Sequence, residues 1–164
     1  MSRGLENIIR GIIVKTSNRV DLNYVDGIRN IRAPDGVIDV LSLDIVRGRL
    51  NGVPNYSMFI KSVGASRGIY SSPDCPHELD MPSSLNQTDP IDCFIRIVAK
   101  NIDNPSDDEL KVAGELRNVY GKVLHVDAIV GLLAEPHLSG VSISKNSAEA
   151  IADQFKRSRD GDRF

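Results

Sequence analysis

The sequence predicts an all-α fold made of one domain or part of one. Apolar residues recur at helical spacing in stretch after stretch, and no stretch alternates apolar and polar residues as a half-buried strand does. The chain also contains neither an internal repeat nor a domain linker. At 164 residues, of which 41% are hydrophobic, it is long enough to bury one core.

The N-terminal part of the chain predicts one clear helix and one weak helix. Residues 5–14 place apolar side chains at i, i+3, i+4, i+7 and i+8, which is typical of an amphipathic helix with one buried face. Residues 24–31 form a weaker helical pattern because Gly27 interrupts it. Residues 33–36, Ala-Pro-Asp-Gly, predict a turn.

Residues 39–56 predict a helix, a sharp corner and a second helix that continues to residue 63. Gly52 can adopt the left-handed conformation that ends a helix, and Pro54 suits the first turn of the next one. One face of the first helix is apolar and another is polar. The apolar positions are Val37, Leu41 and Ile45, and the polar positions are Asp44, Arg47 and Asn51.

The C-terminal half predicts four more helical segments after a long loop at residues 64–89. Asp89 is expected to open the first, with Pro90 in its first turn. Ser106 has the spacing of a capping box with the acidic residue three positions later, and that helix should stop at Gly121. The expected inward positions of the first and last helices are Ile91, Phe94, Ile95, Val98, Ala148, Ile151, Ala152 and Phe155, and the second helix carries Leu110, Ala113, Leu116 and Arg117. A shorter segment covers residues 126–134, and the last helix covers residues 147–159, with Gly161 just beyond its end.

Composition excludes several classes of function. The net charge of −2 and the pI near 5.9 favour neither a nucleic-acid partner nor a membrane-surface partner. No apolar run approaches the roughly 20 residues that span a bilayer, and the N-terminus lacks a secretory signal pattern. Phosphate-binding loops, nucleophile elbows and metal-ligand spacings are also missing from the sequence, which gives no indication of oligomeric state.

The two cysteines and two glycosylation sequons leave the compartment open. We expect Cys75 and Cys93 to be reduced, although an oxidising compartment would allow them to close a loop. The sequons begin at Asn55 and Asn86. Asn86 lies in the predicted loop and is open to a glycan, whereas Asn55 lies at the predicted helix corner and is not expected to carry one.

Residues 39–56 resemble a signature of the animal haem peroxidase superfamily. The matching positions are Asp39, Leu43, Asp44, Arg47, Gly48, Arg49, Gly52, Pro54 and Tyr56. Three positions depart from the signature, because Val46 replaces the usual Gln, and Leu50 and Asn51 replace Asp and His. Later motifs, at residues 127–135 and 154–164, also look like this family and occur in the same order.

The resemblance implies that residues 1–164 are the C-terminal part of a mainly helical haem peroxidase domain. Such an enzyme uses hydrogen peroxide to oxidise a donor, and its haem iron is held by a proximal histidine. None of His77, His125 and His137 matches a haem-ligand position, so we expect each to be solvated or hydrogen-bonded locally. The chain is therefore expected to supply no iron ligand and no catalytic residue.

Asp44 and Arg47 are the candidate cofactor-binding residues. The resemblance implies that Asp44 accepts a hydrogen bond from the proximal histidine and that Arg47 lies beside a haem propionate. The competing interpretation is a plain ion pair at i, i+3 on a helix surface. Arg49 points away from Arg47 and is expected to be structural, and residues 159–163 are interpreted as a helix end joined by salt bridges.

Two other functions remain open at this point. The chain could be a non-catalytic scaffold or interaction module derived from the peroxidase fold, which the changes at Val46, Leu50 and Asn51 favour. It could also belong to a fatty-acid dioxygenase of the same superfamily. The resemblance implies an extracellular or secretory location. Because the family domain is larger, we expect the chain by itself to expose core-facing surface and to be poorly soluble or loosely packed.

Overall fold

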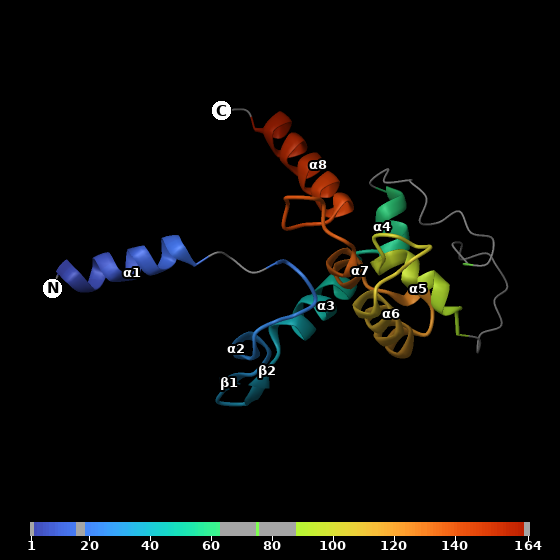
Figure 1. The fold of residues 1–164 in the computed structure, drawn as a ribbon, viewed down its shortest axis with the longest axis horizontal. Helices are drawn as coiled ribbons and strands as arrows, with labels where there is room; N and C mark the ends of the chain where they lie inside the picture. Colours follow the sequence, from blue (N-terminus) through green and yellow to red (C-terminus); the bar gives the residue numbers. More distant parts are fainter. Residues whose placement is uncertain (1, 16–18, 63–74, 76–87, 163–164) are drawn as a thin grey trace.

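The computed structural model describes residues 2–15, 19–62, 75 and 88–162, and this part of the chain is mainly helical (Figure 1). The all-α prediction is confirmed, apart from one small hairpin. The elements in chain order are α1 (Ser2–Val14), α2 (Asp26–Arg29), β1 (Ile31–Ala33), β2 (Gly36–Ile38), α3 (Val40–Leu50), α4 (Tyr56–Ser62), α5 (Ile91–Val98), α6 (Asp107–Tyr120), the 3₁₀ turn η1 (Val123–His125), α7 (Ala128–Ala134) and α8 (Lys145–Gly161).

The hairpin corrects the prediction for residues 24–31. Only α2 is helical there, and Ile31 begins an antiparallel strand that pairs with Ile38. The predicted turn at residues 33–36 joins the strands, and Gly36 adopts φ 140°, a value that disfavours side chains. Each strand has three residues, too few to show an alternating pattern in the sequence. The expectation of no strand was therefore wrong.

Helix ends follow the local chemistry of the sequence where capping side chains are present. The side chain of Asp39 accepts the N–H groups of the second and third residues of α3. At the other end Gly52, with φ 72°, donates to the Arg49 carbonyl and Val53 donates to the Gly48 carbonyl, which together form a Schellman motif. The capping box at Ser106 is present, as predicted, and α6 stops at Gly121.

Several predicted helix ends were misplaced by one or two residues. Pro54 lies before α4, because the Asn55 side chain accepts the Met58 N–H and caps that helix, which begins at Tyr56. Pro90 caps α5 instead of lying within its first turn. Gly161 belongs to α8, since Asp162 still donates to the Ser158 carbonyl.

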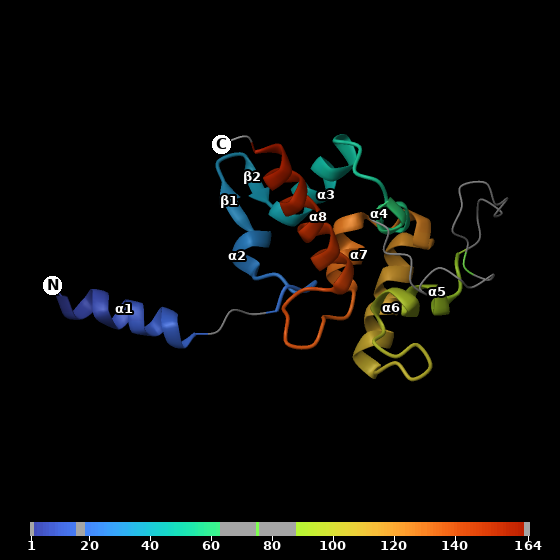
Figure 2. The same ribbon diagram turned by 90° about the horizontal axis from the view of Figure 1, so that it is seen from above.

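The core lies where α4, α5, α6, η1 and α7 meet (Figures 1 and 2). Its fully buried side chains include Tyr56, Ile60, Phe94, Ile97 and Val126. The predicted inner positions Phe94, Ile95 and Val98 of α5 are buried, as are Ala113 and Leu116 of α6. Leu110 of the same helix is 41% exposed.

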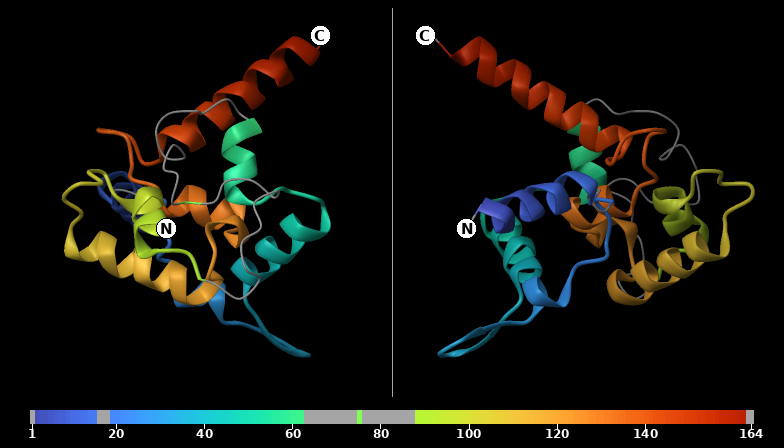
Figure 3. Two further views of the ribbon diagram at one scale, coloured as in Figure 1. Left: turned by 90° about the vertical axis from the view of Figure 1, so that its right-hand side faces the viewer. Right: turned by 60° about the vertical axis from the view of Figure 1, so that its left-hand side comes forward.

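The apolar faces of α1 and α8 are not covered by the described residues. Ile12 of α1 is 70% exposed and Phe155 of α8 is 72% exposed, so the predicted burial of these two faces was wrong. Figure 1 shows α1 extending away from the core, and Figure 3 shows α8 doing the same. The further prediction, that the chain exposes core-facing surface, agrees with this arrangement.

Cys75 and Cys93 form a disulfide, with Cα atoms 5.5 Å apart. The expectation of reduced cysteines was therefore wrong. Both residues are buried against the core, at 6% and 3% exposure, a proximity that sequence separation does not reveal. His77 and Asn86 lie outside the described residues.

Candidate functional site

Asp44 and Arg47 lie on α3 and form an ion pair. Arg47 Nη1 is 3.4 Å from Asp44 Oδ1, and their side chains are 64% and 42% exposed. This is the i, i+3 pair that the helical spacing predicts. The third polar position, Asn51, does not join them, because its side-chain Nδ2 donates to the Arg47 carbonyl at 2.8 Å. Asp44 and Arg47 are therefore both available to a group outside this chain's core.

A pocket of about 220 Å³ lies between α3 and the start of α7. Asp44 and Arg49 line it from α3, and Asp127 lines it from the opposite side. Tyr24 is close to the same region, since its pKa is raised first by burial and then by the negative charges of Asp44 and Asp21.

Arg49 binds Asp127 through two parallel hydrogen bonds. Arg49 Nε is 2.8 Å from Oδ1, and Nη2 is 2.7 Å from Oδ2. The Tyr120 hydroxyl donates to Asp127 Oδ2 at 2.9 Å. The hydrogen bonds from Arg49, and to a smaller extent the one from Tyr120, hold the pKa of Asp127 below its usual value. Burial, followed by the hydrogen bond to Asp127, raises the pKa of Tyr120 to about 12. We refer to Arg49, Asp127 and Tyr120 as the α3 clamp.

A second polar cluster is buried between α4, α7 and α8. Glu135 Oε1 accepts hydrogen bonds from the Tyr56 hydroxyl and, at 2.6 Å, from Asn146 Nδ2. Tyr56 is fully buried, and the other two residues are 6% and 7% exposed. Gly131 of α7 lies directly against the Tyr56 ring, where no side chain would fit.

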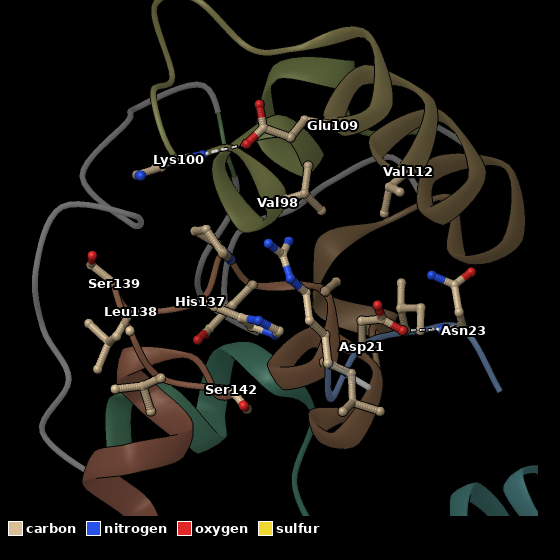
Figure 4. Close-up of a pocket in the computed structure, with 18 residues that line it drawn as sticks. Asp21, Asn23, Val98, Lys100, Glu109, Val112, His137, Leu138, Ser139 and Ser142 are labelled. Atoms are coloured by element: carbon tan, nitrogen blue, oxygen red, sulfur yellow. Dashed lines mark hydrogen bonds between the residues drawn. The ribbon is translucent and has the colours of Figure 1, made fainter. Parts of the chain in front are cut away.

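A larger pocket of about 600 Å³ lies beside the connection between α7 and α8 (Figure 4). His137 lies on this connection, and its Nε2 is 2.8 Å from the Val20 carbonyl oxygen. On the far side of the pocket, the backbone N–H of Lys100 donates to Glu109 Oε1 at 2.9 Å. Positive and negative side chains both line the pocket, so charge alone favours no one ligand class.

The two described histidines make local contacts with backbone carbonyls. His125 Nδ1 lies 3.3 Å from the Tyr120 carbonyl oxygen, and His137 also contacts a backbone carbonyl, as predicted for locally hydrogen-bonded side chains. In the described ranges, no three residues with metal-binding side chains cluster together. The end of α8 carries an exposed ion pair between Arg159 and Asp160, in line with the structural interpretation of residues 159–163.

Sequence reasoning named Asp44 and Arg47 but missed the contacts that join distant motifs. Arg49 and Asp127 are 78 positions apart, and Tyr56 and Glu135 are 79 positions apart. All four occur at positions that the resemblance had marked, which was the available signal. Periodicity along one helix cannot show that two such positions meet in space.

Asp44 and Arg47 offer a partly exposed carboxylate and an exposed guanidinium on α3. The carboxylate can accept a hydrogen bond from an imidazole, and the guanidinium can bind a propionate. No helix in the described ranges is long and apolar enough to cross a membrane.

Comparisons with known proteins agree with the motifs. A family profile described as animal haem peroxidase matches residues 1–74 and 94–164, leaving out the segment that the Cys75–Cys93 disulfide closes. Peroxinectin A of Dictyostelium discoideum is 27% identical over all of this chain and 25% of its own length. Eosinophil peroxidase of Homo sapiens is 29% identical over 98% of this chain and 19% of its own length.

The fold is also found among solved structures. Peroxidase A from Dictyostelium discoideum superposes with a TM-score of 0.67 and 27% identity, covering 99% of this chain and 26% of that one. The chain thus spans about a quarter or less of the relatives that it matches. On these grounds the chain belongs to the animal haem peroxidase family.

Proposed function

We propose that this chain is the C-terminal part of the catalytic domain of a haem peroxidase that uses hydrogen peroxide to oxidise a donor. The observation that carries the proposal is the exposed pair Asp44 and Arg47 on a helix that lies within the residues matched by the family profile. When bound, haem supplies the redox chemistry, and the iron ligand comes from residues outside this chain. The residues of this chain orient and tune the group without reacting themselves.

Asp44 is the proposed partner of the proximal histidine. Its carboxylate lies 3.4 Å from Arg47 Nη1, is 42% exposed and can accept an imidazole N–H. An imidazole that donates to a carboxylate gains anionic character, which raises electron density at the iron and lowers its reduction potential. Asp44 therefore has a tuning role.

Arg47 is the proposed partner of a propionate. A guanidinium matches a carboxylate through two parallel hydrogen bonds, which fix orientation as well as position. The Arg47 side chain is 64% exposed here, so it can turn from Asp44 toward a bound carboxylate. Fixing the haem edge in this way would also keep the histidine aligned with Asp44.

The test is a redox titration of the haem in a protein that contains this chain and the segment with the iron ligand. Asp44→Asn should raise the reduction potential, because the neutral amide gives the imidazole less anionic character. Asp153→Asn is a matched control, since Asp153 is 47% exposed and also pairs locally, with Arg157, on a helix. An unchanged potential in Asp44→Asn would remove Asp44 from the haem environment.

A non-catalytic scaffold is the second candidate function. Leu50 and Val46, which depart from the family signature, are 81% and 48% exposed on α3 and give that helix an apolar outer surface. Such a surface would suit a protein partner better than a charged cofactor edge. A protein containing the iron-ligand segment that fails to bind haem would favour this candidate.

We also propose an extracellular or secretory location. The disulfide between Cys75 and Cys93 supports it, because disulfides persist in oxidising compartments and are rare in the cytosol. Non-reducing and reducing mass measurements of the protein from its native source would test this. Two free thiols in the native protein would count against the location.

A further inference from the structure

The helix that carries Asp44 and Arg47 has little apolar attachment to the core. None of its side chains is fully buried by the described part of the chain. Two of its apolar residues, Val46 and Leu50, are largely exposed. Apolar packing against the described residues therefore holds α3 only weakly, and a polar contact can decide where the helix lies.

The α3 clamp supplies a directional attachment. Both oxygens of Asp127 are bound by Arg49, at 2.8 and 2.7 Å, so rotation of either group breaks a hydrogen bond. Asp127 is itself fixed, because it precedes α7 and its backbone pairs with Asn55. Its side chain is only 13% exposed, and the Tyr120 hydroxyl restrains one of its oxygens. Arg49 thus joins α3 to a rigid part of the core.

The attachment lies close to the proposed cofactor residues. Asp44 precedes Arg49 by five positions on one helix, an axial distance of about 7.5 Å at about 1.5 Å per residue. Asp44, Arg49 and Asp127 line the same pocket of about 220 Å³. A displacement of α3 would therefore move Asp44 and Arg47 together, and misplacement by about 1 Å is enough to weaken an oriented interaction.

We propose that Arg49 is a positioning residue, and that its paired hydrogen bonds to Asp127 set the place of α3 and so of Asp44 and Arg47. The part that concerns haem rests on the proposed function. Arg49 does not touch the reacting atoms, and its guanidinium is occupied by Asp127. The structural role predicted for Arg49 is thus assigned to its contact with Asp127, and this contact affects where Asp44 and Arg47 lie.

The first experiment measures amide hydrogen exchange of α3 in the haem-free protein that contains this chain and the segment with the iron ligand. Arg49→Gln should speed exchange of the α3 amides by about threefold to tenfold, because the helix loses its tie to α7. Arg47→Gln is the matched control: it lies on the same helix with 64% exposure, against 62% for Arg49, but pairs only within α3. It should leave most of that exchange unchanged.

Two further variants keep the test decisive. Arg49→Lys retains the charge but not the paired geometry and should give an intermediate increase. Tyr120→Phe should give a small increase, since it removes one restraint on Asp127. If Arg49→Gln does not fold, Arg49→Lys decides by the same criterion. Equal exchange in the Arg49 variants, the control and the unsubstituted chain would overturn the proposal.

The second experiment measures the haem reduction potential in the protein that includes the iron-ligand segment. Arg49→Gln should raise the potential, but less than Asp44→Asn does, because it misplaces the carboxylate without neutralising it. An Asp44→Asn shift without an Arg49→Gln shift would overturn the positioning role. No shift with Asp44→Asn would instead refute the proposed role of Asp44, while hydrogen exchange still tests the clamp.

Discussion

Gly131→Ala should destabilise the chain strongly, because α7 and α4 touch at this position without space for a methyl group. A Cβ atom at residue 131 would lie 2.8 Å from Tyr56 Cβ and closer still to the ring atoms Cγ and Cδ2. Favourable carbon contacts lie at about 3.5–4.0 Å, so Tyr56 would have to retreat by about 1 Å. Tyr56 is fully buried and its hydroxyl is bound to Glu135, which leaves no easy direction of movement.

The expected cost follows from two opposing terms. Overpacking a tight core costs about 1–3 kcal/mol, and the contact with a backbone-proximal Cβ atom puts this site near the upper end. Replacing a helical glycine by alanine returns about 0.5–1 kcal/mol. The net loss should be about 2 kcal/mol, measured as the change in unfolding free energy from urea titrations followed by circular dichroism.

Gly114→Ala is the matched control for this prediction. Gly114 also lies inside a helix, α6, but a Cβ atom there would meet nothing within 4 Å. This variant should gain about 0.5–1 kcal/mol from helix propensity alone. Equal unfolding free energies for the two variants would refute the argument, because both differ from the parent by the same methyl group.

Three other predictions concern the polar clusters and the disulfide. Tyr56→Phe should cost about 1–3 kcal/mol of unfolding free energy by removing a donor from buried Glu135; a cost near zero would mean that water replaces the hydroxyl. Reducing the Cys75–Cys93 disulfide, which closes a separation of 18 residues, should cost about 3 kcal/mol in the same titration. The pKa of Asp127 is lower in the folded chain than in the unfolded chain. The ionised carboxylate therefore stabilises the fold above its unfolded pKa, and this stabilisation is lost as pH falls through its folded pKa. The melting temperature should therefore fall more steeply between about pH 5 and pH 2 for the parent than for Asp127→Asn.

The sequence predicts best those features that depend on neighbouring residues. Asp39 and Ser106 cap their helices through hydrogen bonds that reach two or three positions along the chain. Gly52 and Gly121 end helices because a positive φ is allowed for them without strain. The Asp44–Arg47 ion pair belongs to the same class, since i, i+3 spacing on a helix brings the two charges together.

Features that depend on residues distant in the sequence were either not predicted or predicted wrongly. The disulfide requires two Cα atoms 5.5 Å apart, and only the fold brings Cys75 to that distance from α5. The bonds between Arg49 and Asp127 join two motifs that each look self-contained in the sequence. The candidate cofactor residues could thus be named from the sequence, whereas the contact that fixes their helix could not.

The exposed faces of α1 and α8 show what helical periodicity does and does not predict. A stripe of apolar residues predicts that a face is covered, because leaving it in water forfeits about 25 cal/mol for each Å² of apolar surface. It does not predict which segment covers it. The helices of the small core pack against one another within this chain, whereas Ile12 of α1 and Phe155 of α8 are not covered by any of the described residues. The matched relatives are at least about four times longer than the aligned region. The apolar stripes of α1 and α8 therefore support the proposal that these faces pack against the rest of a peroxidase domain.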